Sequence, residues 1–150
     1  MDDNLMATLK KMALEIAGLR RDVEDLKRRE IPAGLWKAWT PASQTGWTAM
    51  PTGTFRYVNI GKLVILEINV TGTSNKATTG IALPFTAASS GGWTGTMGFA
   101  MNNGAAILTA TRWNIAAGAG RIDFFTDMGD AGWAASGTKL VNCVAIYERA

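Results

Sequence analysis

A seven-residue repeat of apolar side chains in the first thirty residues constrains this chain more than any other feature. The repeat alternates spacings of four and three residues without interruption, at Leu5, Leu9, Met12, Ile16, Leu19, Val23 and Leu26. Such spacing keeps one narrow stripe facing a neighbouring helix in a left-handed coiled coil. A lone amphipathic helix packed on a globular domain, which is the alternative, usually buries a wider face. We therefore predict that residues 1–30 form a coiled-coil stalk or anchor that joins copies of the chain.

Charged residues beside the stripe predict the direction of the joined helices. With Ile16 at heptad position a, charged side chains fall at positions g and e: Glu15, Asp22, Arg20 and Lys27. In a parallel coil, a residue at g faces the residue five places later on the neighbouring chain, so Glu15 meets Arg20 and Asp22 meets Lys27. Each exposed pair contributes only a few tenths of a kcal/mol. The two attractive pairs therefore predict a parallel, in-register arrangement of the helices. They contribute little to the stability of the coil.

The number of helices in the coil is less constrained than their direction. The β-branched residues Ile16 and Val23 at position a, with leucine at d, favour two strands. Leu9 at a and Met12 at d favour no particular number. The stripe by itself therefore leaves dimer and trimer open.

The composition of the chain changes near position 31, where the helical period ends. Residues 1–30 contain seven basic and seven acidic residues, so their charges cancel. Residues 31–150 contain only eight basic and five acidic residues, which are scattered among Gly, Thr, Ser and Ala. A nucleic-acid interface needs a clustered basic face, and a membrane helix needs about 20 successive apolar residues. We therefore predict a second domain at 31–150, and neither a nucleic-acid nor a membrane partner.

The second domain has the sequence pattern of an antiparallel β-sandwich. Short runs of β-branched and aromatic residues, bounded by Gly, Asn or Pro, predict strands at 55–60, 63–71, 80–83, 94–100, 106–115, 121–126 and 140–148. Glycine-containing segments at 59–62, 102–104 and 117–120 predict tight turns between them. These features favour a jelly-roll-like sandwich built as a meander of hairpins. The run at 140–147 is apolar on both faces, which predicts a central strand or one covered by a neighbouring subunit.

The chain lacks the usual residues of catalytic and metal sites. It has no histidine and a single cysteine, Cys143, in an apolar run that predicts a buried hydrophobic side chain instead of a nucleophile. The spacing of Asp123, Asp127 and Asp130 matches no calcium loop. Nothing in the sequence places one of these carboxyls in an apolar pocket, as a glycosidase acid requires. We predict that the chain is not an enzyme and holds no metal and no cofactor.

All six tryptophans lie in the second domain, at positions 36, 39, 47, 93, 113 and 133. Trp36 and Trp39 follow the coiled-coil segment 1–30, which predicts packing around the neck between subunits, with ligand contact as the alternative. Trp113 lies on an apolar run and is predicted to belong to the core.

Two further tryptophans, Trp93 and Trp133, are predicted to lie in loops. An indole in a loop can stack on a sugar ring while Asp127 or Asp130 accepts hydrogen bonds from the sugar hydroxyls. These four residues are the candidate glycan-binding residues of the chain, and ordinary packing of the loops is the alternative.

A stalk followed by this particular head resembles the fibre and spike proteins of tailed bacteriophages. The resemblance is carried by the segments WKAWTP at 36–41, GWT at 46–48, FRYVNIGKLV at 55–64 and IALPF at 81–85. In that group, a strand that contains an aromatic residue and then Gly-Lys-apolar-Val precedes a long second strand and an apolar-Leu-Pro segment. The resemblance covers most of the head.

The resemblance implies a parallel homotrimer in the virion, with the β-domains closing around the stalk axis. It also implies that the N-terminal region contacts other virion proteins of the capsid or tail, and that the head presents its loops outward to a host-surface polysaccharide. The chain departs from long tail fibres because it is very short and has no separate attachment domain. A head fibre, a tail-tip adhesin and a capsid decoration protein without receptor binding therefore all stay open.

Two further functions compete with the virion protein. A cellular lectin-like carbohydrate-binding module would carry an export signal, and the charged N-terminus lacks the apolar core of one. A polysaccharide-degrading enzyme would carry a carboxyl pair in an acidic cleft. We therefore expect a structural virion protein, a short trimeric fibre or spike whose head adheres to host-surface glycans.

Overall fold

The computed structural model describes residues 8, 11–12, 14–22 and 35–150. The chain divides into two units, Met1–Leu35 and Trp36–Ala150. The boundary predicted from composition, at 30/31, lies outside the described residues.

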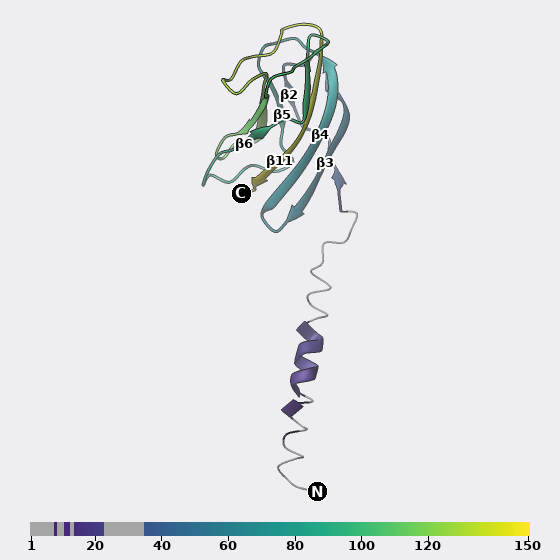
Figure 1. The fold of residues 1–150 in the computed structure, drawn as a ribbon, viewed down its shortest axis with the longest axis vertical. Helices are drawn as coiled ribbons and strands as arrows, with labels where there is room; N and C mark the ends of the chain where they lie inside the picture. The colour runs from purple at the N-terminus through teal and green to yellow at the C-terminus, as the bar shows by residue number, and fades with distance from the viewer. Residues whose placement is uncertain (1–7, 9–10, 13, 23–34) are drawn as a thin grey trace. The chain divides into compact units, whose positions relative to one another are not determined.

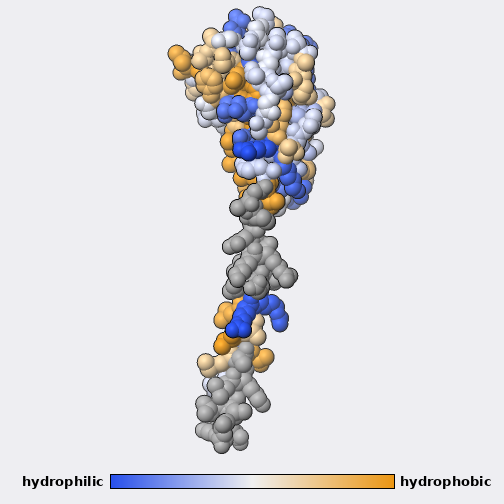
Figure 2. Space-filling view, turned by 90° about the vertical axis from the view of Figure 1, so that its right-hand side faces the viewer, coloured by the Kyte–Doolittle hydropathy of each residue, from blue (hydrophilic) through white to orange (hydrophobic). Residues whose placement is uncertain are grey.

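Residues 8, 11–12 and 14–22 of the first unit are helical, as the heptad pattern predicts. Three residues of the stripe can be seen on this helix, and each of them exposes half or more of its surface: Met12, Ile16 and Leu19. Figure 2 shows hydrophobic and hydrophilic residues next to each other on the surface of this segment. The remaining predicted coil residues, Leu5, Leu9, Val23, Leu26 and Lys27, lie outside the described residues. The helix is confirmed, and its association with other copies stays a prediction.

The second unit consists of two antiparallel sheets packed face to face, which confirms the predicted β-sandwich (Figure 1). The six-stranded sheet has the order β1 (Lys37–Ala38), β3 (Thr52–Ile60), β4 (Leu63–Thr73), β11 (Thr138–Glu148), β7 (Phe99–Asn102) and β8 (Ala105–Ala106). The five-stranded sheet has the order β2 (Gln44–Thr45), β5 (Thr79–Ala82), β10 (Arg121–Phe125), β9 (Arg112–Ile115) and β6 (Trp93–Thr96).

The two longest strands, β4 and β11, lie at the centre of the six-stranded sheet. They pair along their whole length, and β11 pairs on its other edge with β7, so the prediction of a central strand at 140–147 is confirmed. Inward side chains alternate with outward ones, and on β4 the inward set is Val64, Leu66, Ile68 and Val70. Side chains alternate between the two faces because successive residues of a strand point in opposite directions.

Tight turns form where the glycines predict them. Gly61 has a φ of 62° between β3 and β4, and Gly118 has a φ of 68° between β9 and β10. The turn between β7 and β8 places both Asn103 and Gly104 at positive φ, at 52° and 79°. Asparagine and glycine tolerate this conformation better than other residues do, which is why the sequence signal was reliable.

The connections between hairpins differ from the predicted meander. Strand β4 pairs with β11, from the far end of the domain, and not with the strand that follows it. The predicted strand 94–100 is two strands, β6 and β7, which belong to different sheets, and the predicted strand 106–115 is likewise divided into β8 and β9. Local alternation shows that a segment is extended, but which sheet it joins depends on long-range pairing.

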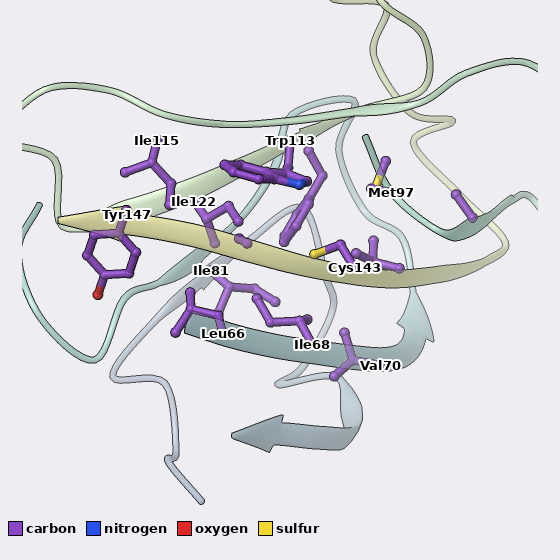
Figure 3. Packing of buried hydrophobic residues seen from close by; sticks show 14 of the residues in the cluster. Leu66, Ile68, Val70, Ile81, Met97, Trp113, Ile115, Ile122, Cys143 and Tyr147 are labelled. Carbon is purple, nitrogen blue, oxygen red and sulfur yellow. The ribbon is translucent and has the colours of Figure 1, made fainter. Parts of the chain in front are cut away.

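The core fills the space between the sheets (Figure 3). Side chains of β4 and β11 face those of β5, β9 and β10, and the buried set includes Leu66, Ile68, Val70, Cys143, Tyr147, Ile81, Trp113, Ile115 and Ile122. The predictions that Trp113 and Cys143 belong to the core are confirmed. Burial raises the pKa of the Cys143 thiol to about 12, so the reactive thiolate is scarce at neutral pH.

Candidate functional site

Trp133 lies outside the strands, as predicted, but its side chain is turned into the protein, which favours ordinary packing of the loop over glycan contact. It follows the loop after β10, and only 3% of its surface is exposed. Its indole N–H donates a hydrogen bond to the carbonyl oxygen of Phe124 at 2.9 Å. A buried indole that is already hydrogen-bonded cannot stack on a sugar ring, and the energy of burying this large side chain outweighs its position in a loop.

Trp93 lies on a strand instead of in the predicted loop. It is the first residue of β6, it is half-buried, and its ring lies 6.3 Å from that of Tyr147, centroid to centroid. It pairs with Ile115, which is a core residue of β9. Trp93 therefore packs against the edge of the core and is not brought together with the aspartates of the loop after β10.

A buried lysine explains the position of two tryptophans. Lys139 on β11 has no exposed surface, and its Nζ lies 4.9 Å from the ring centroid of Trp47 and 5.3 Å from that of Trp133. The ammonium donates hydrogen bonds to the carbonyl oxygen of Gly46 at 2.9 Å and to Thr79 Oγ1 at 2.5 Å. Burial lowers the pKa of Lys139 to about 8. The two indole faces and two oxygens therefore stabilise a cation inside the sandwich.

The position of Lys139 along its strand was a sequence signal for its burial, and the sequence reasoning missed it. Lys139 has the same parity along the strand as Val141, Cys143 and Ala145, all of which point inward. A lysine in an inward position needs partners that compensate for lost hydration. Trp47 and Trp133 provide them, so both are structural residues here.

Trp36 and Trp39, the predicted neck residues, have different surroundings. Trp39 packs within its own head, edge-on against Phe55 at 5.2 Å and Tyr57 at 6.5 Å between ring centroids. Trp36 is exposed, and the guanidinium of Arg56 lies 4.9 Å from its ring centroid. Contact of either residue with a second subunit stays a prediction, and Trp36 has the more open side chain for it.

A groove of about 240 Å³ lies on the five-stranded sheet. It is formed by the start of β5, by β10 and by the loop that follows β10, and its lining residues are Ala77, Thr78, Thr79, Arg121, Asp123, Phe124, Phe125, Asp130 and Gly132. The groove includes one of the four predicted glycan residues, Asp130.

Two arginine–aspartate pairs border this groove. Arg121 Nε lies 2.7 Å from Asp123 Oδ1, and Arg112 forms an ion pair with Asp130. The Arg112 guanidinium also lies 4.9 Å from the ring centroid of Phe125. An aromatic ring beside partly exposed carboxylates and guanidinium groups suits a hydroxyl-rich ligand, because sugars present both apolar faces and hydrogen-bonding edges.

The loop after β10 is shaped by Asp127, whose predicted role was to contact a ligand. Asp127 Oδ1 accepts hydrogen bonds from the backbone N–H groups of Gly129 at 2.8 Å and Ala131 at 2.9 Å. Asp130 has a φ of 70°, a left-handed conformation that aspartate tolerates better than most residues. Asp127 thus holds the loop in a conformation that brings Asp130 to the groove.

Gly80 does not line the groove but lies against Asp123, which does, and sequence reasoning missed it. A Cβ atom at this position of β5 would lie 2.6 Å from Asp123 Oδ1 and 2.9 Å from the carbonyl oxygen of Ile122. A glycine inside a strand often marks the close approach of another group, and that was the available signal. Here it leaves room for the Asp123 carboxylate at the groove.

The described residues contain no group of three or more His, Cys, Asp or Glu side chains that could hold a metal ion, so Asp123, Asp127 and Asp130 do not form one. Within the same part of the chain, no helix is long and apolar enough to cross a membrane.

Comparison with protein-family models, with curated proteins and with solved structures finds no match to this chain. The features that bear on function are therefore the helix with its open apolar stripe, the buried Lys139 cluster and the groove on the five-stranded sheet.

Proposed function

We propose that this chain is a structural virion protein of the tailed-bacteriophage kind, a short parallel homotrimeric fibre or spike with a jelly-roll-like head. In this proposal, residues 1–30 form the coiled coil and contact capsid or tail proteins, and the head is displayed outward. The observation that carries the proposal is the apolar stripe on the described helix. Met12, Ile16 and Leu19 lie at coiled-coil spacing and are open on the chain by itself.

An exposed stripe of this kind needs a partner. A helix of this length is marginal alone in water, because most helical stability in proteins comes from packing an apolar face. Burial of apolar surface contributes about 25 cal/mol per Å², so association through the stripe stabilises the helix and the oligomer together. Glu15, Arg20 and Asp22 are exposed on the same helix, where the predicted in-register pairing needs them.

The groove supports an adhesive role for the head. It joins the ring of Phe125 to the carboxylates of Asp123 and Asp130, which together suit a saccharide. Its volume of about 240 Å³ suits a small part of a polysaccharide, and such a site binds weakly alone. Three linked heads compensate for weak sites, because the second and third contacts form at high effective concentration.

The assembly is tested by the absolute mass of the purified chain in light scattering. Subunits of 16.0 kDa distinguish monomer, dimer and trimer clearly, and a trimer is expected. Ile16→Asp places a carboxylate in the seam of every helix and should dissociate the trimer. The matched control is Ala17→Asp, which adds the same charge one residue away at heptad position b. A monomeric wild type would refute the coil, and a stable dimer would refute the trimer.

Adhesion is tested by binding of the full chain to purified host capsule and lipopolysaccharide. Phe125→Ala and Asp130→Asn should each weaken binding about tenfold or more, since each removes a groove contact. Met128→Ala is the control, because this exposed residue lies in the same loop but does not line the groove. If no polysaccharide binds while the chain still assembles on capsids, the head is a decoration module. Release of reducing ends would show instead that the chain is an enzyme.

A further inference from the structure

The outer face of the six-stranded sheet carries aliphatic side chains that the core does not use. They lie on three adjacent strands, β3, β4 and β11, and we call them the outer apolar patch: Val58, Ile60, Leu63, Ile65, Val144 and Ile146. Each of them alternates along its strand with inward residues, so the six share one face.

The register of the strands makes the patch continuous. Val58 pairs with Ile65, and Ile65 pairs with Ile146, so three β-branched side chains form one row across the sheet. Ile60 pairs with Leu63 in the next row. Neighbouring residues on one face of a sheet contact each other, so the patch is one apolar surface and not six separate side chains.

The patch is open in the single chain. Ile60, Leu63, Val144 and Ile146 expose between 40% and 55% of their surfaces. Scattered exposed apolar residues are normal on a protein surface, but a contiguous apolar patch with a polar rim marks an interaction site. The rim here includes Arg56, Glu67 and Glu148, which occupy outward positions next to the patch.

Two of the three rim charges compensate each other within the chain. Arg56 Nη2 lies 2.6 Å from Glu67 Oε2, so these charges are paired within one chain. The same guanidinium stacks on the ring of Trp36, the first residue of the head, which places Trp36 beside the patch. A face with a large net charge would repel its own copy, and this face compensates its central charges.

We infer that the outer apolar patch packs against the same patch of the other copies of this chain around the coil axis, so that the heads contact each other as well as the stalks. Trp36 lies ten positions after Leu26, the last residue of the heptad stripe. Ten residues span at most about 35 Å even when fully extended. The coil proposed above therefore holds the patches of neighbouring copies at an effective concentration of about millimolar, and this inference rests on that proposed function.

The head contact adds to the coil instead of replacing it. Stable interfaces between separate proteins use about 20–30 residues on each side, and the patch with Trp36 and its rim is smaller. An apolar contact of this size is too weak for free chains at low concentration, but it suffices once a tether removes most of the entropic cost of association. The contact should therefore fix the heads against one another without being the main source of assembly.

Cross-linking of the full chain through an introduced cysteine tests the contact. In Ile146→Cys, a short bis-maleimide should join chains at least five times faster than in the control Leu108→Cys, whose residue is 96% exposed outside the patch. The native thiol does not interfere, because Cys143 is buried and its pKa is raised to about 12. Val144→Cys, the other highly exposed patch residue, guards against a local effect of one substitution.

The occupant is identified by labelling with a mono-functional maleimide in parallel. Cross-linking in both patch variants supports the contact between copies. Rapid labelling without cross-linking would show an open face, and neither labelling nor cross-linking would show a face covered by another segment of the same chain; both results overturn the inference.

Light scattering on the same samples separates this inference from the proposed function. A trimer without patch cross-links refutes only the head contact. A monomer refutes the stalk, and in that case patch cross-links that appear as the chain is concentrated still support contact between heads. A monomer that shows no such cross-links refutes both.

Discussion

The two outer faces of the sandwich differ although they are built by the same alternation of side chains. On the six-stranded sheet, the outward positions of β3, β4 and β11 hold the aliphatic residues of the outer apolar patch. On the five-stranded sheet, the outward positions of β9 and β10 hold Arg112, Asn114, Arg121 and Asp123, and two ion pairs border a groove.

The two faces can differ because a sandwich buries only one side of each sheet and leaves the other side free to vary. An apolar outer face favours contact with protein, because its burial releases water from a large area. A face with charged groups around an aromatic ring favours a polar ligand. The head thus separates a surface suited to self-association from one suited to adhesion, and the following predictions test that separation.

The largest effect is expected where an inward residue is compared with its outward neighbour. Leu66→Ala creates a cavity between the sheets and should lower the free energy of unfolding by about 2–5 kcal/mol. Ile65→Ala, one residue away on the patch, should cost less than about 1 kcal/mol in the Ile16→Asp background, where assembly does not contribute. Urea denaturation of both variants measures this, and equal costs would show that the patch belongs to the folded core of a single chain.

The groove is expected to respond strongly to a single methyl group at Gly80. The added Cβ of Gly80→Ala would meet the Asp123 carboxylate and the Ile122 carbonyl. We therefore expect the free energy of unfolding to fall by about 1–3 kcal/mol. Saccharide binding should be lost as well. Gly98→Ala is the matched control, because its Cβ would meet only atoms of Asn142 at ordinary contact distances. Assembly measured by light scattering should not change in either variant, and a change would contradict the separation of the two faces.

The stability of the head should depend on pH because Lys139 is buried in the core between the two sheets. Burial lowers its pKa from 10.5 to about 8, so between these values the unfolded chain binds more protons and stability rises with pH. The pKa of Cys143 is raised from 9.0 to about 12, which lowers stability as pH rises above 9 and offsets the gain. We therefore expect an increase of about 1 kcal/mol from pH 8 to 9, followed by a plateau.

Thermal or urea unfolding across this pH range measures the effect. Lys139→Met keeps much of the side-chain volume but has no titrating group, so the rise between pH 8 and 9 should disappear. An unchanged rise in this variant would show that another group causes it. Tyr147, whose pKa is raised from 10.0 to about 12 by burial, should lower stability only above pH 10.

The smallest effects are expected from the exposed ion pairs on the two faces. Arg56→Gln and Arg121→Gln should each change the unfolding free energy by less than about 1 kcal/mol, because exposed ion pairs are screened by water and salt. They should differ in function, since Arg56→Gln weakens head-to-head cross-linking and Arg121→Gln weakens saccharide binding. If Arg56→Gln weakened saccharide binding, if Arg121→Gln weakened cross-linking, or if one variant impaired both activities, the two faces would not have separate roles.

Much of the fold could be predicted from the sequence because its signals are local. The strand near 63–71 shows strict alternation of buried residues, and Gly61 and Gly104 mark turns that few other residues form easily. Much less of the candidate site could be predicted. Asp130 was a candidate and lines the groove, which the sequence did not predict. Trp133, another candidate, turns inward because an indole beside a buried lysine gains more from the core than from solvent.

The heptad stripe, the two-part organisation, most of the strands and the tight turns follow from local sequence, since each depends on residues close together in the chain. Three features emerge only from long-range packing: β6 and β7 join different sheets, Lys139 lies between Trp47 and Trp133, and Phe125 and Asp130 meet at one groove. These features depend on pairing between distant strands and on which face of each strand is buried. Neither is encoded in local periodicity, because alternation looks the same whichever sheet a strand joins.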